Sequence, residues 1–136
     1  MGPFITDEKL PVLRFIVKIY KYVHDSNFIM TKILSLVTSR ETEKINMALN
    51  FSKRQKAAGH DIRILFFGPS EAVLAENEEI KNAIKADFPY SDRPKACIAV
   101  AQMQNIDAKL KGTAELVRAG EYITKSIDEG YSVITF

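Results

Sequence analysis

Short apolar segments alternate with helical patterns along most of this chain, and this alternation constrains the fold more than any other feature. Helices between strands indicate a parallel sheet that is covered on both faces. We therefore expect a three-layer α/β/α fold around a mostly parallel five-stranded sheet. The expected strands lie at residues 32–37, 62–67, the extended run that ends near Cys97, 114–118 and 131–136.

Helix signals fill the intervals between these strands. Thr38 and Glu41 have the spacing of a capping box, so we expect a helix to begin at Glu41 and to continue to Ala58, before Gly59. Gly68-Pro69-Ser70-Glu71 predicts a turn into a short helix. Further helices are expected at residues 77–88 and 121–129, where apolar side chains or paired charges recur at helical spacing.

The first 29 residues stand apart from this alternation. Between Leu10 and Val23 nearly every residue is apolar, and the basic residues Arg14, Lys18 and Lys21 lie on one narrow helical stripe. Such a helix can pack on its own domain, form a subunit interface or lie on a membrane surface, and it is too short and too charged to span a membrane. We expect packing on protein. The sequence therefore predicts an N-terminal helical extension (1–29) and an α/β domain (30–136).

Composition excludes several classes of function. The chain has 136 residues, of which 46% are hydrophobic and 26% charged, as in an ordinary globular protein. Its formal net charge of +2 gives no argument for nucleic-acid binding. A single cysteine cannot form an intramolecular disulfide, and no secretory signal is recognised, so we expect the cytoplasm. Neither a phosphate-binding glycine fingerprint nor metal-ligand spacing occurs, and no cofactor or metal is expected.

The single cysteine, Cys97, is the candidate catalytic residue. It lies where an extended run turns into a helical pattern, and the free N–H groups of a helix's first turn favour a thiolate. A thiolate can act as a nucleophile or carry sulfur. The alternative interpretation is a small buried hydrophobic residue, because free cysteine is among the most buried residue types.

Small and polar residues follow two of the predicted strands. The carboxyl ends of parallel strands lie at one edge of the sheet, where ligands bind in open α/β folds. We expect a shallow ligand-binding pocket at this edge, close to Cys97. The alternative is that Thr38 and Ser70 are helix caps. The candidate ligand-binding residues are Thr38, Ser39, Gly68, Pro69 and Ser70.

From residue 30 to residue 136, the chain resembles the DsrE/DsrF-like sulfur-relay family, whose members have the YchN-like fold. The resemblance depends on five segments in order. They are the opening strand at 32–38, the Ala58-Gly59-His60-Asp61 turn, the Phe66-Phe67-Gly68-Pro69-Ser70 loop, the Ala96-Cys97-Ile98-Ala99-Val100-Ala101 segment and the closing run at 129–136.

The resemblance implies a small subunit of a homo-oligomer, a trimer or hexamer, in which the cysteine at position 97 carries sulfur as a persulfide. The expected function is a sulfur carrier or sulfurtransferase-like subunit that meets a sulfur-donor or acceptor protein. Relay members tend to follow the cysteine helix with paired arginines and a glycine. Here Met103-Gln104-Asn105-Ile106 occupies that stretch, and Asn105 can supply the left-handed turn. The alternative function is a non-catalytic homo-oligomeric module that binds a small ligand or partner and in which Cys97 is structural. The sequence leaves open whether the protein is an enzyme.

Overall fold

The computed structural model describes residues 10–24 and 30–136. The chain divides into two compact units, Met1–Met30 and Thr31–Phe136, and each is described by itself. The first contains helix α1 (Leu10–His24), which begins with Pro11 in its first turn, as the sequence predicts. Among the described residues, no helix is both long enough and apolar enough to cross a membrane.

The second unit is an α/β domain with a five-stranded sheet. Its strand order is β4-β3-β2-β1-β5, and every neighbouring pair is parallel. This confirms the predicted fold class. The strands are β1 (Lys32–Val37), β2 (Asp61–Phe66), β3 (Lys95–Cys97), β4 (Glu115–Val117) and β5 (Ser132–Thr135); the helices are α2 (Thr42–Ala57), α3 (Pro69–Glu76), α4 (Glu78–Asp87), α5 (Ile98–Met103) and α6 (Ala119–Asp128), with 3-10 turns η1 (Tyr90–Asp92) and η2 (Ala108–Leu110).

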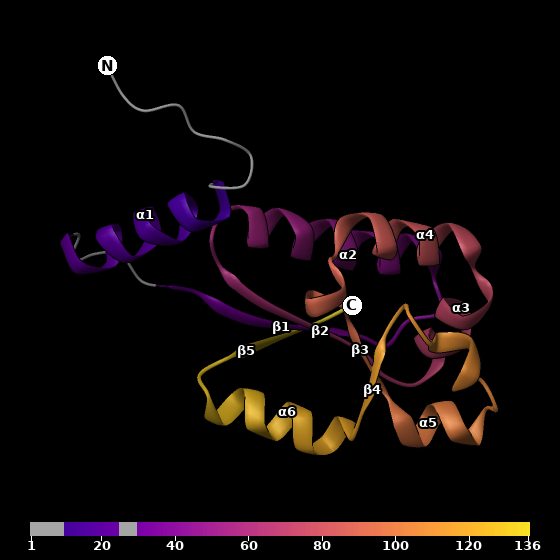
Figure 1. Cartoon of the computed structure of the whole chain (residues 1–136). Helices are drawn as coiled ribbons and strands as arrows, with labels where there is room; N and C mark the ends of the chain where they lie inside the picture. The colour runs from indigo at the N-terminus through magenta and orange to yellow at the C-terminus, as the bar shows by residue number, and fades with distance from the viewer. Residues whose placement is uncertain (1–9, 25–29) are drawn as a thin grey trace. The chain divides into compact units, whose positions relative to one another are not determined.

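Helices cover both faces of this sheet. Figure 1 shows α2 and α4 on one side and α5 and α6 on the other, while α3 lies near the carboxyl ends of the strands. Because side chains alternate along a strand, β1 contributes to two apolar clusters. Val37 and Ile33 belong to the cluster with α2 and α4, whereas Leu34 and Leu36 belong to the cluster with α6.

One polar pair lies inside the core between the sheet and α2. Ser35 and Ser52 are both fully buried, and their hydroxyl oxygens are 2.9 Å apart in a hydrogen bond. A buried hydroxyl without a partner costs about 1–3 kcal/mol, so each serine satisfies the other. The pair fixes the position of α2 over β1.

The predicted capping box at the start of α2 is wrong. The helix begins at Thr42, Glu41 is its N-cap, and no side chain caps it. The backbone N–H of Thr38 donates to Phe136 O at 2.9 Å, and its hydroxyl donates to the same oxygen at 3.2 Å. Pairing with the chain after β5 therefore keeps Thr38 extended, while the hydroxyl of Ser39 accepts from the N–H of Glu41 at 3.0 Å.

The predicted left-handed turn after the cysteine helix is confirmed. Asn105 has a φ of 56°, in the left-handed region. The N–H of Ile106 then donates to Ala101 O at 2.9 Å, which closes the end of α5. An asparagine thus performs the task that a glycine performs at many helix ends.

Candidate functional site

Cys97 lies at the junction that the sequence predicted. It is the last residue of β3 and the N-cap of α5, with an extended backbone (φ −71°, ψ 119°). In the sheet it is in register with Val117 of β4, beyond the end of the pairing between β2 and β3. The residue therefore lies at the carboxyl edge of the sheet, at the end of an inner strand and beside the edge strand β4.

The side chain of Cys97 nevertheless belongs to the core. Its residue is 5% exposed, and it packs in the apolar cluster of the α6 face with Leu34, Leu65, Ala119 and Tyr131. β-Strand alternation explains this burial, because Ala96 faces the cluster below α2 and its neighbour Cys97 must face α6. In the described domain, the geometry is that of a packing residue rather than a reachable thiol.

The two basic residues that precede Cys97 have other partners. Lys95 forms an ion pair with Glu115 on the neighbouring strand. Arg93 donates its Nε–H to Phe88 O at 2.8 Å and also hydrogen-bonds Gly112 O. Both side chains tie β3 and its preceding loop to adjacent segments, so these contacts do not direct their charge at the thiol.

The hydroxyls of the predicted ligand site bond the adjacent backbone. The Ser70 hydroxyl donates to Val37 O at 2.5 Å, and Ser70 is fully buried. Thr38 and Ser39 make the backbone contacts given above. Gly68 (φ 86°) allows the chain to turn from β2 into Pro69, the first residue of α3. The structure brings these residues together at one edge. Ser70 ties the start of α3 to the end of β1, Thr38 ties the end of β1 to Phe136, and Ser39 bonds within its own loop.

Sequence reasoning missed a buried carboxyl group at the same edge. Glu71 in the first turn of α3 is fully buried; its Oε2 accepts the N–H of Gly68 at 3.0 Å, and its Oε1 has no hydrogen-bond partner among the described residues. Burial raises the pKa of Glu71 to about 7, against the lowering effect of the Gly68 N–H. The sequence did contain a signal for this contact. Glu71 follows Gly68 by three residues before an apolar run, which is the spacing of a capping box.

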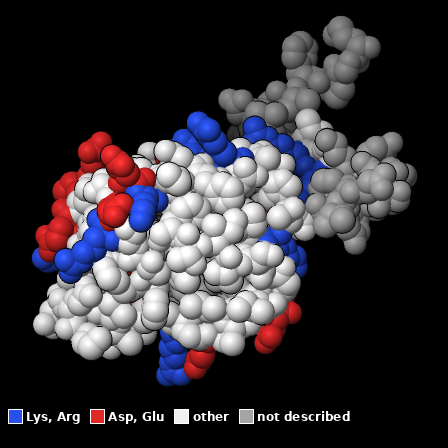
Figure 2. Space-filling model, turned by 180° about the vertical axis from the view of Figure 1, so that it is seen from behind, with Lys and Arg blue, Asp and Glu red and all other residues white. Residues whose placement is uncertain are grey.

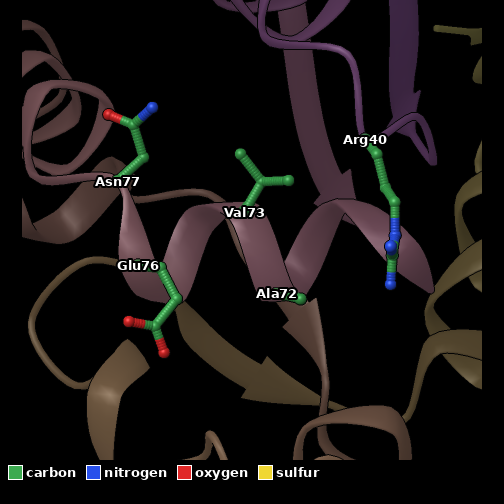
Figure 3. A pocket seen from close by; sticks show the side chains of 5 residues that line it. All are labelled: Arg40, Ala72, Val73, Glu76 and Asn77. Atoms are coloured by element: carbon green, nitrogen blue, oxygen red, sulfur yellow. The ribbon is translucent and has the colours of Figure 1, made fainter.

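A shallow hollow of about 440 Å³ adjoins this edge. Figure 3 shows Arg40, from the loop after β1, at one end of the hollow, and Glu76 and Asn77 at the other, with Ala72 and Val73 between them. The Glu76 carboxylate is paired with Lys109, whose hydrogen bond lowers the pKa of Glu76. The Asn77 side chain caps α4 by accepting from the N–H of Ile80 at 3.0 Å. Two of the polar groups are thus already engaged.

A second cluster of polar groups lies at the opposite end of the strands. The Cζ of Arg63 is 4.1 Å from the ring centre of Tyr131 and 5.7 Å from that of Tyr122. Arg63 also forms an ion pair with Glu129 and donates to the Ser126 hydroxyl at 3.0 Å. Burial raises the pKa of Tyr122 to about 12, so its phenol stays neutral. The contacts of Arg63 make its partly exposed guanidinium a structural link between β2 and α6. The sequence contains no signal for this link, because the partners of Arg63 are distant along the chain.

The described residues do not form a metal centre, since no group of three or more histidine, cysteine, aspartate or glutamate residues lies close enough together. On the face seen in Figure 2, basic and acidic side chains lie next to one another near one end, and the middle of the face is uncharged. A phosphate-binding surface would instead concentrate basic residues.

Comparison with known proteins shows the fold but no family. No protein-family model matches the sequence, and no curated protein does either. A solved structure, that of a conserved protein of unknown function, BT1422, from Bacteroides thetaiotaomicron, is similar with a TM-score of 0.67. The match covers 77% of this chain and 95% of that protein at 15% sequence identity. The shared architecture is thus an independent example of this α/β fold.

Proposed function

We propose that this protein is a non-catalytic homo-oligomeric module that binds a partner protein or a small ligand, with Cys97 as a core residue. The observation that supports this proposal above others is the 5% exposure of Cys97 within an apolar cluster. A sulfur carrier must let its thiolate sulfur attack an incoming persulfide or disulfide. A sulfur enclosed by Leu34, Leu65 and Tyr131 cannot make that approach without an opening of the fold.

We propose a homo-oligomer as the assembly of this module. The resemblance to the DsrE/DsrF-like family favours a trimer or hexamer, and an edge of the sheet remains uncovered in the described domain. For the ligand-binding role, Thr38, Ser39, Gly68, Pro69 and Ser70 remain the proposed residues. Their hydroxyls and the N–H groups of Thr38, Ser39 and Gly68 are already bonded within the protein. A partner protein that packs over the edge needs fewer free hydroxyls than a small polar ligand does.

The second candidate function is a sulfur carrier or sulfurtransferase-like subunit with Cys97 as its persulfide-forming thiol. Its support is positional: Cys97 is the N-cap of α5 at the carboxyl edge of the sheet. This helix has six residues, so a local opening of α5 would expose the sulfur at a smaller cost than unfolding of the domain. The partner would then be a sulfur-donor or acceptor protein.

One experiment separates the two functions. The folded protein is incubated with a persulfide donor and a desulfurase, and its intact mass is measured beside a known sulfur carrier and the Cys97→Ser variant. The proposed module gains no sulfur under conditions that load the carrier. Addition of sulfur to the protein but not to Cys97→Ser would overturn the proposal and support the relay function.

We further propose the cytoplasm as the compartment, because one cysteine provides no intramolecular disulfide for an oxidising environment. Nucleic acid and membrane are not proposed partners. The net charge of +2 is too small for a phosphate-tracking surface, and a membrane-surface role would fall to the separate unit that contains α1. Fractionation of cells that express the full chain tests this: recovery in the membrane pellet after a low-salt wash would contradict it.

A further inference from the structure

Strand β5 is an uncovered edge of the sheet. Among the described residues it pairs with β1, and no strand lies on its other side. All four of its residues, Ser132–Thr135, are exposed, although Val133 and Ile134 are large and apolar. Because side chains alternate, Val133 lies on the α6 face and Ile134 on the α2 face, so each face of this strand has a partly exposed apolar side chain.

The backbone of β5 also has free hydrogen-bonding groups. On the inner side, the N–H of Phe136 donates to Leu36 O at 2.8 Å, and Phe136 O accepts from the N–H of Thr38. Alternate residues of a strand bond in the same direction, so Ile134 faces β1 in the same way. Val133 and Thr135 therefore turn their N–H and C=O groups outward, where they form a template for another strand.

The sequence of β5 lacks the features that normally protect a sheet edge. Exposed edges are commonly blocked by charged residues or proline, which disfavour pairing with another chain. Residues 131–136 contain neither. The other edge strand, β4, begins with a charged residue, Glu115, which forms an ion pair with Lys95 of β3. A second copy of β5 meets no like charge, and this charge compatibility distinguishes it from the β4 edge.

We infer that β5 pairs antiparallel with β5 of a second copy of this chain, around a two-fold axis at Ile134. In this register Val133 lies opposite Thr135 of the second copy, and each such pair exchanges two hydrogen bonds. Ile134 lies opposite Ile134 of the second copy as a close, non-hydrogen-bonded pair. The two sheets then continue into each other.

This inference rests on the proposed homo-oligomer and names its contact surface. It also distinguishes between the two assemblies expected from the family resemblance, because a hexamer built from two trimers has two-fold axes and a trimer has none. Ile127 of α6, which is 52% exposed, lies on the same face as Val133 and extends the apolar contact beyond the strand.

Charge placed at the two-fold axis tests the pairing. Native mass spectrometry and light scattering measure the assembly of the full chain, Ile134→Lys, Ile134→Glu and their equimolar mixture. Each variant alone places like charges opposite each other and should weaken the two-fold contact by about tenfold or more, while the mixture should restore it through opposite charges. Met103→Lys is the matched control, since Met103 is 78% exposed on α5 and far from β5 in the sheet order.

A disulfide cross-link tests the register independently of charge. Ile134→Cys should form a disulfide-linked dimer on mild oxidation, because a close antiparallel pair lies within disulfide reach. Met103→Cys should not, and an excess of alkylating reagent is present during denaturation so that Cys97 is capped as it becomes exposed. An oligomer that is unchanged by Ile134→Lys and uncross-linked through Ile134→Cys would overturn the inference and leave the proposed function standing. A full chain that is monomeric at all concentrations would overturn both.

Discussion

The buried carboxyl group of Glu71 makes the stability of this protein depend on pH in an unusual direction. Its Oε2 accepts one backbone N–H, its Oε1 has no partner among the described residues, and no ion pair compensates the charge. Protonation removes the cost of burying a charge, so the folded state holds its proton up to a pH of about 7. Replacement by glutamine, which keeps the shape and cannot ionise, removes this dependence.

The magnitude follows from the two pKa values. The unfolded chain loses the Glu71 proton near the ordinary value of 4.5, whereas the folded chain loses it near 7. Below pH 4.5 both states are protonated and the group has no effect. Between the two values the folded state binds more protons, so each pH unit removes about 1.4 kcal/mol of stability, and the loss reaches about 3 kcal/mol above pH 7.

Denaturant unfolding between pH 5 and pH 8.5 measures this effect. The free energy of unfolding of the natural chain should fall by about 2–3 kcal/mol over the range, and that of Glu71→Gln should fall much less. All other titratable groups are common to both proteins, so the difference between them isolates Glu71. Glu78→Gln serves as the control, because Glu78 is exposed in the first turn of α4. Parallel pH profiles for the natural chain and Glu71→Gln would refute the reasoning.

Three further predictions concern the core and its turns. Cys97 should react with an aromatic disulfide reagent at least about a hundred times more slowly in the folded protein than in denaturant, and a rapid native reaction would contradict its burial. Ser52→Ala should lower the free energy of unfolding by about 1–3 kcal/mol, because Ser35 loses its buried partner; an unchanged denaturation midpoint would contradict this. Asn105→Gly should preserve or raise the melting temperature, whereas Asn105→Val should lower it, since a β-branched residue disfavours a positive φ.

The elements of the fold could be predicted from the sequence because they depend on local patterns. The apolar run at 32–37, the stop at Gly59 and the Gly68-Pro69 turn coincide with β1, the end of α2 and the start of α3. Asn105 was predicted to replace a glycine at a left-handed turn, and it does. The error at Thr38 has a tertiary cause: the hydroxyl bonds Phe136 O, a partner 98 residues away.

The candidate site was less predictable, since its chemistry depends on environment. The residues around Cys97 were consistent with two interpretations. One was a reachable thiol at a helix start, and the other was a buried packing residue. Strand alternation and the cover of α6 decided the burial. The position of Glu71 was visible in the sequence, but the loss of solvent that raises its pKa was not.

The sequence by itself determined the order and type of the elements, because hydrophobic periodicity, caps and turn residues act over a few neighbours. Only the tertiary structure decided which side chains lose water and which strand has no neighbour. The enclosure of Cys97, the stacking of Arg63 on Tyr131 and the bare edge at β5 all result from the strand order 4-3-2-1-5. That order is set by the combined packing of helices over both faces, and no single stretch of the chain encodes it.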